Sequence, residues 1–157
     1  NQTSYYLAST GLASVRQDEG TLEPRHEQDI IENLPSKIEN SFDVFVHDPW
    51  RPVPTLGGHA AIPAGSFDRS GIDCRTDVLT YTSALLEEDL HLAGDVAVEV
   101  FCTADTPSFD LCAVLSEVRP DGSVYNFTQG YIRLDQNKPG CSEKPGFCLI
   151  PLQATCV

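Results

Sequence analysis

Short segments in which apolar and polar residues alternate run along most of the chain. Residues 95–102 place Val96, Val98 and Val100 at every second position, separated by Ala97, Glu99 and Phe101. A period of two is typical of a β-strand with a buried face. With enrichment in β-branched and aromatic residues as a second criterion, strands are predicted at residues 41–47, 77–83, 95–102, 109–118, 123–134 and 147–157.

Two of these strands are separated only by a short turn sequence. Pro120-Asp121-Gly122 stands between residues 109–118 and 123–134. Proline presets its φ angle and glycine accepts a positive one, so this sequence predicts a tight turn and a β-hairpin over residues 109–134. Gly130, in the middle of the second strand, predicts a bulge or a close backbone approach.

Helical signal is weak. Residues 83–90 could form one or two turns with Ser83 as N-cap. Residues 16–40 are polar and are predicted to form a long surface excursion. Many short predicted strands separated by turn sequences favour an all-β fold, either an antiparallel sandwich or a jelly roll. Residues 1–157 are expected to form a single domain.

Charge and length narrow the functional classes. The 157 residues include 23 acidic and 10 basic side chains, for a net charge of −13. Such a field repels phosphate backbones and anionic lipid, so neither nucleic acid nor membrane is an expected partner. The chain opens at Asn1 and contains no methionine, so we expect it to be a piece of a longer protein.

Six cysteines, at positions 74, 102, 112, 141, 148 and 156, leave the redox state open. An even count allows three disulfides, but Cys102, Cys112 and Cys148 lie in apolar strand-like runs, where a reduced thiol acts as a small buried hydrophobe. Reduced thiols are therefore favoured over disulfides, and zinc is disfavoured because the chain has no C-x-x-C pair. The sequons at Asn1 and Asn126 matter only in a secreted protein.

No catalytic constellation is recognisable. The chain has no G-x-S-x-G sequence, and of its four histidines only His47 and His59 flank an unusual segment. A structural hydrogen-bonding role is favoured for both histidines because no supporting cluster accompanies them. Asp73, Arg75 and Asp77 predict a structural ion pair, with calcium binding as the weaker alternative. We therefore expect no catalytic residue, no metal and no cofactor in this chain.

The unusual segment is "HDPWRPVPTLGG", residues 47–58, which we call the strap. Its prolines lock φ and hold the preceding residues extended, and Gly57-Gly58 then permits a sharp reversal. Trp50 is its one large side chain. Stiff backbone loses little entropy when it packs on a neighbour, so docking is one interpretation, and cover for a sheet edge is the other.

The strap also carries a family resemblance. "FDVFVHDPWRPVPTLGG" (42–58) resembles the D-P-x-x-P-V-P-T-x-G-G signature of the carboxy-terminal, non-catalytic domain of the X-Pro dipeptidyl-peptidase and cocaine-esterase family of serine hydrolases. Weaker similarity covers residues 4–14, 73–105 and 109–133. Leu111, Val114 and Glu117 depart from the family's usual Phe, Lys and Asp. The similarity spans nearly the whole chain.

The resemblance implies a jelly-roll β-sandwich, galactose-binding-domain-like, that would continue past residue 157 with further strands. It implies an upstream α/β-hydrolase domain of the same polypeptide that holds a Ser-His-Asp triad and cleaves esters, amides or X-Pro dipeptides. No residue here would inherit a catalytic role. Pocket-lining positions would be His59, Ala60, Ala61 and Ile62. Interdomain docking would use Asp48, Pro49, Trp50, Pro52, Pro54, Gly57 and Gly58.

Alternative functions remain open at this point. The chain could be a free-standing jelly-roll module for carbohydrate or protein, or a secreted disulfide-bonded interaction domain. An open sheet edge would allow a homodimer. A cytoplasmic location is the expectation that accompanies reduced thiols.

Overall fold

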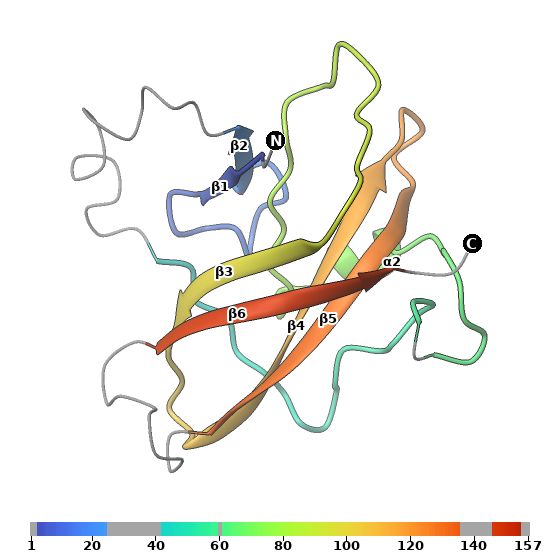
Figure 1. Ribbon diagram of the computed structural model, residues 1–157. Coiled ribbons are helices and arrows are strands. Elements are labelled where there is room, and N and C mark those ends of the chain that lie inside the picture. The colour runs from blue at the N-terminus through green and yellow to red at the C-terminus, as the bar shows by residue number, and fades with distance from the viewer. Residues whose placement is uncertain (1–2, 25–41, 60, 136–145, 155–157) are drawn as a thin grey trace. The chain divides into compact units, whose positions relative to one another are not determined.

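A computed structural model describes residues 3–24, 42–59, 61–135 and 146–154 (Figure 1). Almost all of its regular structure is β-strand, which confirms the predicted all-β class. The chain divides into two compact units. The first comprises Asn1–Pro54 and Gly71–His91, and the second Thr55–Ser70 and Leu92–Val157. Because the boundary at Pro54 falls inside the strap, the two parts of the strap belong to different units.

The second unit is built on a four-stranded antiparallel sheet. Its strand order is β3-β6-β5-β4, with β6 hydrogen-bonded to both β3 and β5 (Figure 1). The strands are β3 (Val96–Cys102), β4 (Ser108–Val118), β5 (Val124–Asp135) and β6 (Gly146–Ala154). The predicted strands at 95–102, 109–118, 123–134 and 147–157 are therefore present, within a few residues at their ends.

One face of this sheet is apolar. Val96, Val98 and Val100 alternate in burial with their neighbours along β3, as the period of two predicts. Val98 pairs with Ile150 of β6, which is almost fully buried. Because side chains of paired residues emerge on the same face, these residues form a continuous apolar layer across the β3–β6 edge of the sheet.

The predicted hairpin is present, but its irregularity lies elsewhere than predicted. Gly122 closes the turn between β4 and β5 with φ = 85°. Gly130, predicted to mark a bulge or a close backbone approach, pairs in regular register with Ala113, so the bulge is not at this position. The register instead shifts where Leu115 pairs with Thr128 and Ser116 with Asn126, so that Phe127 is the extra residue. A bulge of the classic type needs no glycine, because its first residue adopts an ordinary right-handed conformation.

In the first unit, β1 (Tyr5–Ala8) and β2 (Thr21–Pro24) form a separate antiparallel pair. Thr82 joins this pair only through an isolated bridge to Thr21. At Gly20 a Cβ would lie 1.9 Å from the carbonyl oxygen of Thr80, so the two segments approach too closely for any other residue there. β2 lies within the predicted excursion 16–40, of which residues 25–40 are outside the described residues.

The predicted strands at 41–47 and 77–83 are wrong. Residues 42–47 join no ladder, and Thr82 makes only its single bridge. Side chains bind these segments instead. Asp43 accepts hydrogen bonds from Ser9 Oγ and Tyr81 Oη, both at 2.6 Å, and from the Ala13 amide at 2.9 Å. The alternating pattern is real, but it produces a strand only where a neighbouring strand offers backbone partners.

The predicted helix at 83–90 is also wrong. Leu85, Leu86 and Leu90 are exposed, so an amphipathic helix there would bury no apolar face, and most helical stability comes from such burial. The only helical turn among the described residues is α2 (Ser70–Asp73). Asp68 precedes it and accepts a hydrogen bond from the Ser70 amide at 3.0 Å, as an N-terminal cap does.

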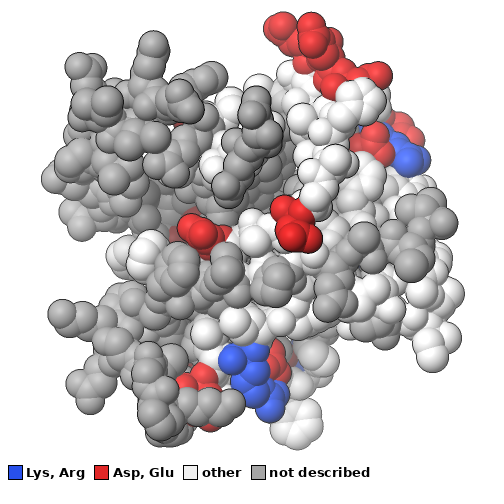
Figure 2. Space-filling model, in the orientation of Figure 1, with Lys and Arg blue, Asp and Glu red and all other residues white. Residues whose placement is uncertain are grey.

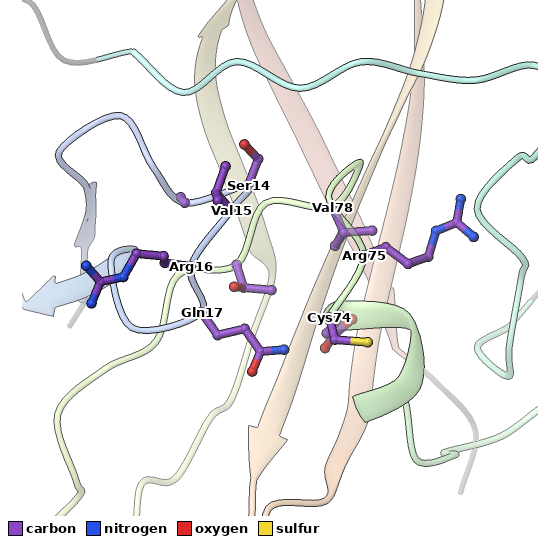
Figure 3. A pocket seen from close by; sticks show the side chains of 10 residues that line it. Ser14, Val15, Arg16, Gln17, Cys74, Arg75 and Val78 are labelled. Carbon is purple, nitrogen blue, oxygen red and sulfur yellow. The ribbon is translucent and has the colours of Figure 1, made fainter.

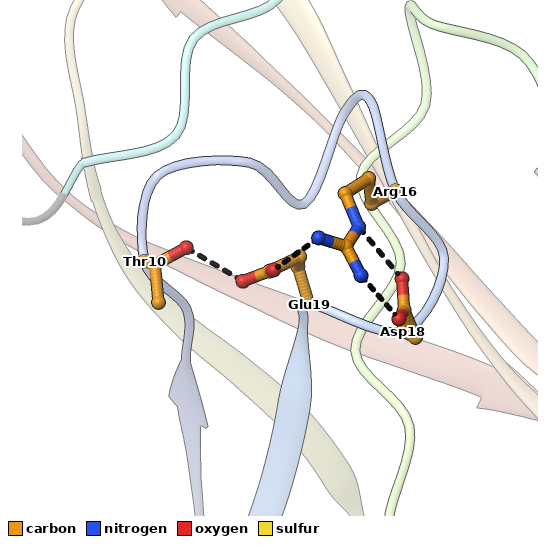
Figure 4. A network of polar contacts seen from close by, with 4 residues as sticks. All are labelled: Thr10, Arg16, Asp18 and Glu19. Carbon is orange, nitrogen blue, oxygen red and sulfur yellow. Dashed lines mark hydrogen bonds and ion pairs between the residues drawn. The ribbon is translucent and has the colours of Figure 1, made fainter.

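Ion pairs lie on the surface of the first unit. Arg16 binds Asp18 through two nitrogens at 3.1 and 2.6 Å and reaches Glu19, which accepts a bond from Thr10 (Figure 4). The Arg16 and Asp18 side chains are mostly exposed. Such pairs contribute little to the free energy of folding because water screens them. The network therefore orders the local turn and adds little to the stability of the fold.

Candidate functional site: the strap and the glycine loop

The strap begins with a turn that leaves its tryptophan in solvent. The Asp48 carboxylate accepts a hydrogen bond from the Trp50 amide at 2.9 Å, and its carbonyl accepts one from the Arg51 amide at 3.0 Å. Pro49, Pro52 and Pro54 are exposed, and the Trp50 side chain is 91% exposed. Asp48 therefore sets a local turn that presents the indole outward.

Arg75 ties this turn to the rest of the first unit. Its Nη2 donates to the Arg51 carbonyl at 2.7 Å, while Nε and Nη2 bind the Asp77 carboxylate at 2.7 and 2.6 Å. The guanidinium bond holds the pKa of Asp77 below its usual range, against the opposing effect of burial. Of the predicted trio, Arg75 and Asp77 are thus brought together, while Asp73 ends α2.

Two hollows lie near these residues, and neither resembles an active site. A hollow of about 220 Å³ is lined by Val46, Asp48, Arg51, Arg75, Thr76 and Asp77. A second, of about 10 Å³, lies between residues 13–17 and 73–80 (Figure 3). The second has room for about one water molecule. Figure 3 shows the Arg16 and Arg75 side chains extending in opposite directions, so they do not form one cationic site.

The end of the strap, in the second unit, is a glycine pair in close contact with its surroundings. Gly57 and Gly58 have φ angles of 64° and 82°, which favour glycine. Gly58 and Gly65 exchange both backbone hydrogen bonds, at 2.7 and 3.1 Å. A Cβ on Gly58 would lie 2.0 Å from the Gln129 amide nitrogen. We call residues 57–65, closed at their base by this exchange, the glycine loop.

The tip of the glycine loop carries the predicted pocket-lining residues. His59 is half-buried, and its Nδ1 has no hydrogen-bond partner among the described residues. Its ring lies 6.5 Å from that of Tyr131 in an edge-to-face arrangement. Ala61 is half-buried and Ile62 fully exposed, whereas Ala60 is outside the described residues. Apart from His59, the described residues of the tip are thus apolar.

Sequence reasoning missed the residues on β5 that hold this loop. Asn126 and Gln129 are 0% and 1% exposed, and both contact the glycine loop or its continuation. The available signal was two amide side chains in a predicted strand rich in apolar residues, where an unpaired buried polar group is costly. In the sequence, Asn126 stands out only as the first residue of a sequon. Its amide donates to the Gly65 carbonyl at 3.3 Å, so it is inaccessible to glycosylation in this fold.

Thiol burial differs from the prediction. Cys112 is exposed on β4 and Cys102 is half-buried, whereas both were expected in the core. The reason is register: Cys112 pairs with Tyr131, on the sheet face opposite the apolar layer. The side chain of Cys148 is outside the described residues.

No group of three metal-ligating side chains occurs among the described residues. On the face drawn in Figure 2, acidic side chains are scattered and the basic ones form no continuous patch over the described surface. No helix of the described part has the length and apolarity to cross a membrane.

Comparison with known proteins agrees with the resemblance carried by the strap. A family model described as the X-Pro dipeptidyl-peptidase C-terminal non-catalytic domain matches residues 2–155. Cocaine esterase of Rhodococcus sp. (strain MB1 Bresler) is 29% identical over 135 residues, which cover 84% of this chain and 22% of that protein. The "Putative serine esterase" proteins of Mycobacterium bovis and Mycobacterium tuberculosis are each 36% identical over 84 residues, covering 54% of this chain and 12% of theirs. The chain thus spans about a fifth or less of these relatives.

Proposed function

The chain belongs to the family of X-Pro dipeptidyl-peptidase C-terminal non-catalytic domains, and from this premise we propose that it is the accessory β-domain of a larger serine hydrolase. An upstream α/β-hydrolase domain would supply the nucleophile and its base for ester, amide or X-Pro dipeptide cleavage. The observation that carries the proposal is the family match over residues 2–155, joined to the strap motif within it.

Docking on the catalytic domain would use the strap. Phe42, Val44, Val46 and Trp50 are all exposed, and they lie on or beside a proline-stiffened segment. Exposed apolar side chains gathered in one segment mark an interaction surface. The docking residues we propose are Asp48, Pro49, Trp50, Pro52, Pro54, Gly57 and Gly58. The three prolines stiffen this segment, which limits the entropy lost on association.

The glycine loop would shape the substrate pocket. We assign His59, Ala60, Ala61 and Ile62 to the side of the pocket that receives the acyl group. Support comes from the small apolar tip and from the closed base that holds it. Small residues at such a position leave room for a bulky acyl group, because size complementarity in an apolar pocket discriminates by about 1–3 kcal/mol per methylene.

The test is a substitution in the whole hydrolase. Ala61→Phe should lower kcat/KM for bulky acyl esters about tenfold or more relative to small ones, because the ring fills the space. Ala93→Phe, on an exposed loop residue outside the glycine loop, is the matched control and should leave the ratio unchanged. An Ala61→Phe enzyme with the selectivity of the unaltered protein would contradict the pocket role.

A free-standing binding module is the second candidate. The exposed rings of Trp50, Phe42 and Phe101 favour it, because sugar-binding platforms use exposed aromatic faces. Finding no hydrolase domain in the complete reading frame would favour this candidate over the first.

The cysteines bear on cellular location. Cys74 and Cys112 are thiols, which supports a reducing, cytoplasmic location.

The sheet edges bear on assembly. Among described strands, β3 and β4 each pair on one side only, so either edge could pair in a homodimer.

A further inference from the structure

The glycine loop is held at its base by β5 as well as by its own backbone. Beyond the exchange of bonds between Gly58 and Gly65, the Phe67 amide donates to Asn126 Oδ1 at 2.9 Å. The Asn126 amide donates in turn to the Gly65 carbonyl at 3.3 Å. One side chain therefore fixes both an acceptor and a donor of the segment that closes the loop.

Asn126 satisfies two backbone groups of the loop segment at once. It is 0% exposed near the start of β5, where burial of an amide costs free energy unless its bonds are made. An apolar residue of similar volume would leave the Phe67 amide and the Gly65 carbonyl without this partner, at a cost of about 1–3 kcal/mol. It would also not select one position of the Gly65–Phe67 backbone.

Gln129 constrains the other side of the base. Its amide lies where a Cβ on Gly58 would fall, 2.0 to 2.4 Å from three of its atoms. Gln129 is 1% exposed, and its Nε2 has no partner among the described residues. The end of the Gln129 side chain therefore forms a wall against Gly58, directly before His59.

Tyr131 extends the same contact toward the tip. Its ring meets His59 edge to face at 6.5 Å, and its hydroxyl shares a hydrogen bond with Thr55. Asn126, Gln129 and Tyr131 thus contact the loop at Gly65–Phe67, Gly58 and His59 respectively. All three lie on one strand, so the position of the loop follows the position of β5.

We infer that Asn126 and Gln129 are positioning residues for the glycine loop, and that they help set the acyl selectivity of the hydrolase without touching substrate. The inference rests on the proposed role of that loop at the substrate pocket. Displacement of a pocket-lining segment by about 1 Å can change a rate about 100-fold. A small shift of the loop, caused by a change at either buried amide, is therefore enough to change the selectivity.

The test uses Asn126→Asp in the whole hydrolase. Aspartate keeps the acceptor for the Phe67 amide but replaces the donor to Gly65 by a carboxylate that repels the carbonyl. We expect the ratio of kcat/KM for bulky and small acyl esters to change about tenfold or more. Gln129→Asn, which shortens the wall against Gly58, should change the same ratio and serves if the first variant folds poorly.

The matched control is Arg133→Gln. Arg133 lies on the same strand, and its guanidinium binds Asp110 at 2.7 and 2.6 Å. Because this pair makes no bond to the glycine loop, the selectivity ratio should stay within about twofold. Hydrogen exchange supplies a readout besides activity. The Gly58 and Gly65 amides, which close the base of the loop, should exchange faster in Asn126→Asp, whereas those of β3 should be unchanged.

The outcomes separate the two proposals. If Ala61→Phe changes selectivity but neither Asn126→Asp nor Gln129→Asn does, the positioning inference is overturned and the proposed function stands. If none of the three changes it, both the pocket role and the inference fall. Lower thermal stability with an unaltered selectivity ratio would show a purely structural role and would also overturn the inference.

Discussion

Asp43 joins three segments of the first unit that are far apart in the sequence. Its carboxylate accepts bonds from Ser9, the Ala13 amide and Tyr81. Burial opposes its ionisation, but these bonds outweigh burial and hold the pKa of Asp43 below its usual value. Burial and the bond to Asp43 raise the pKa of Tyr81, so the phenol remains a donor. Asp43 therefore fixes the segment that leads into the strap.

Asp43→Ala should lower the free energy of unfolding by about 1–3 kcal/mol at neutral pH, because it leaves three donors without their acceptor. The folded pKa lies below the unfolded value, so the carboxylate stabilises fully above about pH 4 and loses its effect as pH falls through the folded pKa. The difference between variant and unaltered protein should therefore shrink in acid. Urea unfolding at pH 7 and pH 3 measures it.

The control for that experiment is Asp95→Ala. Asp95 is exposed, so its removal should change stability by less than about 0.5 kcal/mol at either pH. Equal losses in the two variants would mean that Asp43 acts only through net charge.

The residue scale is also where sequence reasoning was weakest. Asp43 bonds to Ser9 across 34 positions and to Tyr81 across 38, and no local pattern reveals such a pairing. The roles of Asn126 and Gln129 were invisible for the same reason. Arg75 and Asp77 stand two positions apart, so their pairing could be predicted.

At the scale of elements, the β4–β5 hairpin shows what local chemistry determines. The Pro-Asp-Gly turn and the two flanking patterns predicted it, and Gly122 adopts the positive φ that the turn needs. Local sequence was equally strand-like at 41–47 and 77–83, yet no ladder forms there. A strand needs a partner, and the partner is chosen by the whole fold.

Gly122→Ala should destabilise the hairpin by about 1–2 kcal/mol, because a Cβ is strained at φ = 85° although space is available. Gly122→Asn should cost less, since asparagine tolerates this region. Gly71→Ala is the matched control: it too has open space, its φ is not positive, and it lies in α2, so stability should hold or rise slightly. Thermal unfolding compares the three, and equal midpoints would contradict strain at the turn.

At the scale of the whole molecule, apolar exposure is the dominant property. Phe42 and Val46 are mostly in solvent, although the strand pattern at 41–47 predicted a buried face, and Trp50 is mostly in solvent as well. Composition and the strap motif were enough to predict an all-β domain of this family. They could not show which apolar side chains are exposed to solvent, because exposure depends on which segments fold against them.

Trp50→Ser in the whole hydrolase should lower its thermal midpoint and open the junction between domains to protease, because a buried tryptophan at an interface contributes about 2 kcal/mol or more. Leu85→Ser is the matched control: Leu85 is 92% exposed and Trp50 91%, but Leu85 lies outside the strap. If both substitutions have the same small effect, the strap does not dock.

The extra residue in β5 has a consequence for how this domain can vary. Asn126 and Gln129 are three positions apart, an odd spacing that in a regular strand would send their side chains to opposite faces. As the extra residue of the bulge, Phe127 inverts the alternation of side chains, so that Asn126 and Gln129 lie on the same face and both contact the loop. Loss of this one residue would reverse the orientation of everything on one side of it while every other amino acid stayed the same. Chain length at this point is therefore as much a determinant of the loop's support as the identity of the two amides.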